Sequence, residues 1–188
     1  MQGASSSAQG LNRQEELKHQ VLKVQLYDAL KKGFEENCKK ILEQLPVDSS
    51  LNSLGVTALH MAACNGSESL FKLVLAHGPN INVRDGMGRT PLHAAVANEH
   101  VGIITMLLAH PAILVDSQSL GGETPLMRAI VFGRRESVRM LLQAGASLSI
   151  KNNGGQTALD ILRQNPSSNL LDLFTLEKDE DGNVQMKD

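Results

Sequence analysis

The chain has 188 residues, of which 41% are hydrophobic but only 3% aromatic, so aliphatic side chains and alanine must fill its interior. Its formal net charge of −2 provides no basic surface for sequence-independent contacts with phosphates, which argues against a nucleic-acid partner. No segment approaches the roughly 18 apolar residues of a membrane-spanning helix, and no stretch resembles a secretion signal, so we expect no membrane partner and a cytoplasmic or nuclear location.

The N-terminal part predicts a disordered segment followed by two short helices. Residues 1–12 have too little apolar surface to offset the entropy lost on ordering, so we expect disorder there. Apolar residues then recur with helical spacing over 26–30 and 38–42, on either side of Gly33. Polar residues surround both stretches, which indicates helices with one face toward water.

From residue 55 onward a short motif recurs. The string Gly-Val-Thr-Ala-Leu-His of residues 55–60 returns three more times in related form. Its four threonines, spaced by 33, 34 and 33 residues, are Thr57, Thr90, Thr124 and Thr157. Threonine caps helix starts and proline fits the first helical turn, so each motif predicts the start of a helix. The small residues that follow, such as Ala62 and Ala63, allow neighbouring helices to approach closely.

Two positions depart from the repeated pattern. Glu99 stands between two predicted helices, where the neighbouring units have Gly66 and Gly133. A residue other than glycine in the left-handed conformation costs about 1 kcal/mol, which the repeat should survive. His110 and Pro111 replace the usual glycine after the next helix, so we predict a distorted loop there. Either it is a tolerated insertion or its shape is read by a partner.

At the C-terminal end the motif at Thr157 opens a helix that Pro166 should stop, and the apolar residues of 170–174 predict one final turn. Residues 177–188 predict a flexible acidic tail. This tail superficially resembles a calcium-binding loop. Its first position is Glu177 and its twelfth is Asp188, where such loops have aspartate and a bidentate glutamate, so we predict no calcium site.

The repeat length and the Thr-Pro-Leu-His core are typical of ankyrin repeats, and residues 22–175 resemble that family. The resemblance implies an all-α fold: a solenoid of about five helix-turn-helix repeats with short hairpin loops and degenerate capping repeats at both ends. The expected domain covers residues 13–176. Its repeats lie near 20–51, 52–84, 85–118, 119–151 and 152–176.

The family resemblance also implies the function. We expect a non-catalytic module that binds a partner protein through its concave groove and finger loops, as a regulator or adaptor. It should be monomeric when unbound and need no cofactor. The alternative is a structural subunit, or a fragment of a larger multidomain enzyme or assembly.

The family pattern names the residues that should carry this function. The expected partner-binding residues are Leu54, Val56, Met87, Arg89, Leu120, Glu123, Arg128, Val131, Phe132 and Arg135. The expected structural motif residues are Thr57, His60, Thr90, His93, Thr124 and Thr157. Phe132 is the strongest candidate for an anchor, because exposed apolar patches mark interaction sites. The alternative, left open here, is that Val131 and Phe132 pack beneath the adjacent repeat.

No residue pattern predicts catalysis or a metal site. The histidines occupy repeat positions too far apart to share an ion, and the two cysteines, Cys38 and Cys64, match no zinc spacing. Cys64 is expected at a groove position but has no predictable base beside it. Asn82 lies in a finger where members of the family can be hydroxylated, although the upstream spacing is imperfect.

Overall fold

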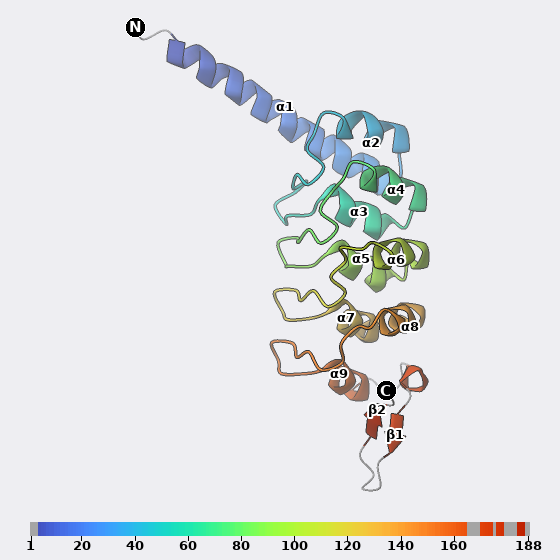
Figure 1. Cartoon of the computed structure of the whole chain (residues 1–188). Coiled ribbons are helices and arrows are strands. Elements are labelled where there is room, and N and C mark those ends of the chain that lie inside the picture. Colours follow the sequence, from blue (N-terminus) through green and yellow to red (C-terminus); the bar gives the residue numbers. More distant parts are fainter. Residues whose placement is uncertain (1–3, 165–169, 175, 179–183, 187–188) are drawn as a thin grey trace. The chain divides into compact units, whose positions relative to one another are not determined.

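The computed structural model describes residues 4–164, 170–174, 176–178 and 184–186. The chain forms two compact units, Met1–Pro91 and Leu92–Asp188. They are called the N-terminal and C-terminal units below, and each is considered by itself. Within each unit short helices are paired, and long loops, called fingers here, join one pair to the next (Figure 1).

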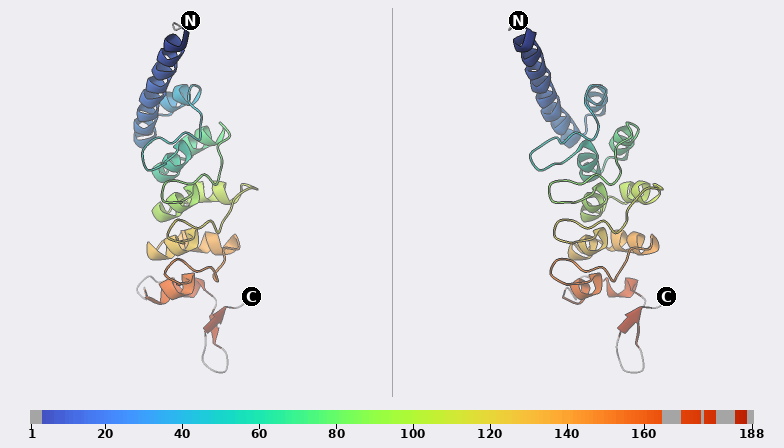
Figure 2. Two further views of the ribbon diagram at one scale, coloured as in Figure 1. Left: turned by 90° about the vertical axis from the view of Figure 1, so that its left-hand side faces the viewer. Right: turned by 60° about the vertical axis from the view of Figure 1, so that its left-hand side comes forward.

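The N-terminal unit contains α1 (Ala4–Lys32), α2 (Glu35–Leu42), α3 (Ala58–Asn65) and α4 (Glu68–Leu75). Helix α1 packs on α2 and α3, while α4 packs on α2 and α3. The helices of this unit therefore form two layers, α1 with α3 and α2 with α4, which Figure 2 shows from two further sides.

The C-terminal unit contains α5 (Pro91–Asn98), whose first residue lies at the boundary, α6 (Val101–Leu108), α7 (Pro125–Val131), α8 (Arg135–Gln143) and α9 (Ala158–Gln164). Helix α7 packs on both α8 and α9, and α8 also packs on α6. The predicted all-α class is thus confirmed for the repeats, which follow one another as helix, turn and helix.

The chain continues with a 3-10 helix, η2 (Leu171–Leu173), followed by the strands β1 (Leu176–Lys178) and β2 (Val184–Met186). Leu170 and Phe174 are buried on either side of η2, so the predicted final apolar turn is present. The two strands pair antiparallel, in the register Leu176 with Met186, Glu177 with Gln185 and Lys178 with Val184. The structure therefore differs from the expected flexible tail over these residues; the rest of that tail lies outside the described residues.

Helix α1 is much longer than the sequence predicted. It begins at Ala4, whereas residues 1–12 were expected to be disordered, so the structure corrects this prediction for residues 4–12. Leu22, Leu26 and Leu30 are buried and fix the C-terminal part of the helix against the unit. Once such a nucleus exists, adding residues at the helix end costs little, and no proline interrupts the extension.

The helix boundaries follow from local residues. Thr57 and His60 form a capping box at the start of α3, and Gly66 ends this helix with φ of 88°. The Ser67 side chain then accepts a hydrogen bond from the Leu70 amide at the start of α4. Because threonine marks the start of a helix and glycine marks its end, these residues set the positions of the turns in each repeat.

Glu99 has a structural role that compensates for its unfavourable backbone. It is the one described residue other than glycine with a positive φ, at 57°. Its carboxylate accepts a hydrogen bond of 2.9 Å from the amide of Glu136, in the first turn of α8. A negative charge at a helix N-terminus is favourable because it meets unpaired N–H groups. The side chain thus offsets the cost of the left-handed conformation.

We expect Glu99→Ala to lower the free energy of unfolding by about 1–2 kcal/mol, because alanine keeps the unfavourable φ and loses the helix cap. Glu99→Gly loses the cap but relieves the backbone, so its net change should stay within about 1 kcal/mol. Urea unfolding followed by circular dichroism measures both. Equal stabilities for the alanine variant and the wild type would show that the cap contributes nothing.

Candidate functional site

The motif residues of the second repeat connect one finger to the next. The Thr57 amide donates to His60 Nδ1 at 3.3 Å, and His60 Nε2 donates to the Arg89 carbonyl at 2.8 Å. These two contacts require a neutral ring with its proton on Nε2. Burial lowers the pKa of His60 below its ordinary value, although the bond to Arg89 opposes this effect.

We expect stability to fall over the pH range that begins at about pH 7 and extends downward. Because the folded protein has the lower histidine pKa, the unfolded chain binds a proton more readily below about pH 6.5, and protonation favours unfolding. Stability present above this pH is lost as the pH falls toward the folded pKa. Thermal unfolding across this range measures the loss. His60→Gln should flatten the profile, and an equally steep profile in that variant would contradict this assignment.

Two predicted contact residues of the N-terminal unit lie on neighbouring fingers. Leu54 and Met87 are 58% and 54% exposed. The amide of Gly86 donates to the Leu54 carbonyl at 2.7 Å, which joins the two finger tips. The side chain of Val56 is half-buried and so less exposed than those of Leu54 and Met87. Leu54 and Met87 are together called the finger-tip surface below.

Arg89, predicted to contribute to the rim of the binding surface, is held by its own finger. Its Nη2 lies 2.7 Å from Asp85 Oδ2, and its Nε donates to the same oxygen at 2.8 Å. Burial by itself raises the pKa of Asp85, but the hydrogen bonds and charge of Arg89 outweigh it, so the pKa is lowered. Asp85 Oδ1 also accepts the amides of Met87 and Arg89. Arg89 therefore shapes the finger, and its guanidinium is already paired.

In the C-terminal unit, a threonine and a histidine hold the base of the fourth repeat. Thr124 Oγ1 accepts the Met127 amide at 3.3 Å and caps α7. His93 Nε2 lies 3.0 Å from the carbonyl oxygen of Glu123. These contacts fix the point from which α7 starts, and so the positions of the side chains along it.

Three predicted contact residues of this repeat form a connected row. Arg128 Nη1 lies 3.5 Å from Glu123 Oε2, and the Arg128 guanidinium lies 5.2 Å from the centre of the Phe132 ring. A cation above an aromatic face at this distance is attracted by the ring. Phe132 is 48% exposed and Val131 50%, so the structure does not bury them beneath a neighbouring repeat. Glu123, Arg128, Val131 and Phe132 are called the fourth-repeat surface below.

The two remaining predicted residues lie on other elements of this repeat. Leu120 is 68% exposed on the finger that precedes α7, and Arg135 is exposed at the start of α8. The neighbouring Arg134 is committed within the unit, since its Nε donates to the Ala97 carbonyl at 2.8 Å.

The other repeats show that the fold does not require an aromatic residue at position 132. Counted from the motif threonine, the same position holds Asn65, Asn98 and Asn165. The Asn65 side chain donates to the Leu30 carbonyl at 3.2 Å, and that of Asn98 to the Ala94 carbonyl at 2.9 Å. An asparagine there satisfies backbone groups, whereas Phe132 exposes an apolar ring. The aromatic side chain at this position is therefore not a requirement of the repeat.

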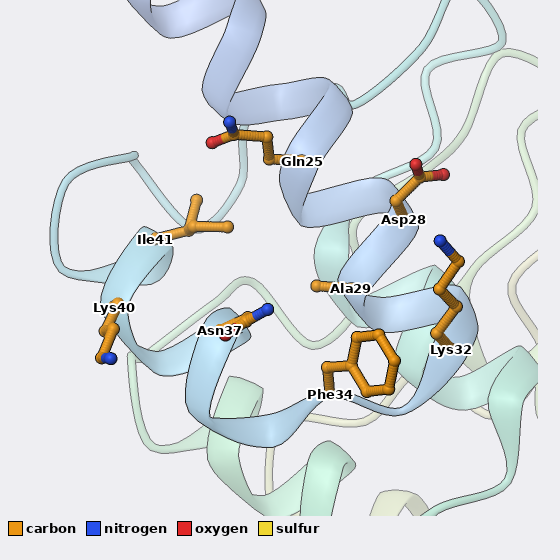
Figure 3. Close-up of a pocket in the computed structure, with 8 residues that line it drawn as sticks. All are labelled: Gln25, Asp28, Ala29, Lys32, Phe34, Asn37, Lys40 and Ile41. Atoms are coloured by element: carbon orange, nitrogen blue, oxygen red, sulfur yellow. The ribbon is translucent and has the colours of Figure 1, made fainter.

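Sequence reasoning missed two features of the N-terminal unit. Leu17, Val21 and Val24 are exposed at helical spacing along α1. A pocket of about 450 Å³ lies between α1 and α2 (Figure 3). Its lining mixes apolar, amide and oppositely charged side chains, so it selects no ligand class. The lining residues are Gln25, Asp28, Ala29, Lys32, Phe34, Asn37, Lys40 and Ile41. Neither feature follows from the motif, because the part of the chain before residue 55 does not contain it.

Chemically reactive groups are few in the part of the chain that the structure describes. No group there of three or more His, Cys, Asp or Glu side chains could hold a metal ion. Cys64 is exposed, whereas Cys38 is buried, and burial together with the charge of Glu35 raises the pKa of its thiol to about 11. Cys38 is therefore a protonated core residue. Within the described residues, no helix combines the length and apolar character needed to span a bilayer.

Comparison with known proteins agrees with the repeated architecture. The profile described as ankyrin repeats (3 copies) matches residues 26–119 and 86–153, which together cover more than half of the chain. A Danio rerio protein whose name describes it as a palmitoyltransferase, ZDHHC13, is 39% identical over 57 residues. That match covers 30% of this chain and 9% of the other protein, so it extends only to a small part of that protein. The length and coverage of the profile match show that the chain belongs to the ankyrin-repeat family.

Proposed function

We propose that this chain binds a partner protein, and that the fourth-repeat surface provides the principal contact. The supporting observation is Phe132, an exposed aromatic ring at a position where the three other repeats with the motif threonine have asparagine. Aromatic and arginine side chains dominate the binding energy of many protein interfaces. Phe132 and Arg128 are already stacked, so little side-chain freedom remains to be lost on binding.

The finger-tip surface is proposed as a second contact. Leu54 and Met87 expose apolar side chains on fingers joined by a backbone hydrogen bond. Methionine adapts its shape to different partners, and a fixed neighbouring backbone limits the entropy lost on binding. A module of this kind acts as a regulator or adaptor by occupying a surface of its partner. We do not assign it a reaction of its own.

The proposal also covers the cellular location and the oligomeric state of the protein. We place the protein in the cytoplasm or nucleus, supported by two free cysteines, since disulfides are rare in those compartments. We also propose that it is monomeric when unbound. Light scattering coupled to size-exclusion chromatography tests this point, and a mass twice that of the chain would overturn it.

The test uses Phe132→Asn, which installs the residue that the three other motif repeats have at this position. The wild type and the variant are immobilised in turn and exposed to lysate of the native source. The matched control is Leu114→Asn, which alters another exposed apolar residue, on a loop and 60% exposed against 48% for Phe132. We expect a protein that the wild type and the control retain and that Phe132→Asn loses, with a decrease in affinity of at least about tenfold. Equal retention by all three would refute the fourth-repeat surface as the principal contact.

A second proposal is that these repeats are the binding module of a longer polypeptide that carries an enzyme. The similarity to a segment of a protein named as a palmitoyltransferase favours it. An antibody raised against the chain would then detect a much larger species in lysate of the native source. A single species of the mass of this chain would exclude this second proposal.

A further inference from the structure

Arg128 lacks much of the hydrogen bonding that an arginine can form. Its side chain is 21% exposed, and its ion pair to Glu123 is long at 3.5 Å. Its Nε is buried and has no hydrogen-bond partner among the described residues. A guanidinium carries five N–H donors in a planar fork, and a desolvated donor without an acceptor costs about 1–3 kcal/mol. The positive charge of the Arg128 guanidinium is therefore only weakly neutralised by neighbouring groups.

The repeats again show that the fold does not need this residue. Counted from the motif threonine, the position of Arg128 holds Met61, Ala94 and Ile161 in the other repeats. An arginine at this position therefore introduces a charge where an aliphatic side chain is sufficient. Phe132 lies against the guanidinium and fixes its plane, which leaves less rotational freedom to lose when a second group binds.

We propose that Arg128 and Phe132 bind an acidic and apolar segment of the partner protein. In this arrangement, which rests on the proposed function, an aspartate or glutamate carboxylate binds Nη1 and Nη2 of Arg128 end-on. An aliphatic or aromatic side chain next to it packs on Phe132 and Val131. The carboxylate supplies the short bidentate bonds that Glu123 does not make, and bidentate arginine–carboxylate pairs are among the strongest hydrogen bonds in proteins.

This assignment favours an acidic segment over a basic one. A lysine directed at Glu123 would meet the positive charge of Arg128 at close range. Glu123 is the more exposed of the two and can turn toward water, whereas Arg128 is held against the Phe132 ring and is the more desolvated. Electrostatic attraction grows as water is excluded, so the larger gain comes from an anion placed on Arg128.

The experiment selects binders from a displayed library of random peptides, with the full chain as bait. We expect the enriched peptides to contain aspartate or glutamate beside a large apolar residue. The synthetic form of the most enriched peptide is then titrated calorimetrically against the wild type, Arg128→Met, Arg128→Lys and Phe132→Asn. Methionine is the matched replacement because the second repeat has Met61 at this position, so the fold should tolerate it. Circular dichroism checks the folding of each variant.

Arg128→Met should weaken binding by about ten- to hundredfold, the range for one hydrogen-bonded charge, and Arg128→Lys should weaken it less. Changing the acidic residue of the peptide to its amide should cause a similar loss on the wild type and little further loss on Arg128→Met. This arm leaves the protein unchanged, so it tests the pairing even if a variant folds poorly. Raised salt should also weaken binding to the wild type.

The outcomes separate this inference from the proposed function. Peptides that lose affinity with Phe132→Asn, but not with Arg128→Met or with the amide change, would overturn the acidic segment and leave the surface intact. Peptides whose affinity is the same for Phe132→Asn and the wild type would overturn both. A selection that enriches no peptide, or enriches basic ones, would also overturn the acidic segment.

Discussion

Replacing Phe71 by alanine is expected to lower the free energy of unfolding by about 3–5 kcal/mol. Phe71 lies on α4, is fully buried and is among the largest fully buried side chains of the protein. Removing its ring takes away the free energy of burying it and leaves a cavity among neighbours that can only partly close. Because only 3% of the residues are aromatic, few other rings contribute to the interior. Urea unfolding of the purified chain measures the loss.

Phe132→Ala is the matched control, since it removes the same atoms from a half-exposed site. It gives up the contact with Arg128 and part of the apolar burial, so we expect about 1 kcal/mol of lost stability. For partner affinity the order reverses: Phe132→Ala should cost at least about tenfold. Phe132→Ala could instead lower stability as much as Phe71→Ala and leave partner affinity unchanged. That result would assign Phe132 to the core and refute the proposed contact.

Gly122→Ala is also expected to have a large effect. It should lower the free energy of unfolding by about 2–5 kcal/mol. Gly122 has φ of 75°, a conformation that an L-residue adopts at a cost of about 1–2 kcal/mol. A β-carbon at this position would also lie 2.7 Å from the Asn153 amide nitrogen and 2.9 Å from the α-carbon of Asn152. Both are backbone atoms of the next finger, so relief of the overlap requires the fingers to separate.

Gly155→Ala separates the two causes. Gly155 also has φ of 75°, but among the described residues a β-carbon there would meet no atom within 4 Å. It should therefore show only the conformational cost of about 1–2 kcal/mol. The difference between the two variants, measured by thermal or urea unfolding, is the cost of the close approach between the fingers. Equal losses would mean that the fingers adjust without penalty.

The repeated motif explains why the architecture was predictable from sequence. Each threonine and each turn glycine acts on groups within a few residues, as in the capping box of Thr57 and His60. The motif returns every 33 or 34 residues, so it also predicts the spacing of the repeats that carry it and the position of each turn. The final buried turn at Leu170 and Phe174 was predictable for the same reason, since its apolar spacing is local.

The candidate site was less predictable, because its properties depend on contacts between residues that are distant in sequence or on choices among rotamers. The family pattern named Arg89 and Arg128 alike. The structure shows Arg89 paired with Asp85 inside its finger, while Arg128 lies on Phe132 with a weak ion pair. Hydropathy could not decide whether Phe132 is buried, since an apolar residue at a helix end can face a neighbour or water.

Sequence alone determined the family, the repeat period and the helix starts that follow the motif threonines. Those features arise from interactions of short range, which the order of residues specifies directly. Only the tertiary structure decided the length of α1, the pairing of β1 with β2 and the target of the Glu99 carboxylate, which caps α8 through the amide of Glu136. Each of these depends on which groups folding brings together across a repeat or a turn, and no local pattern encodes that.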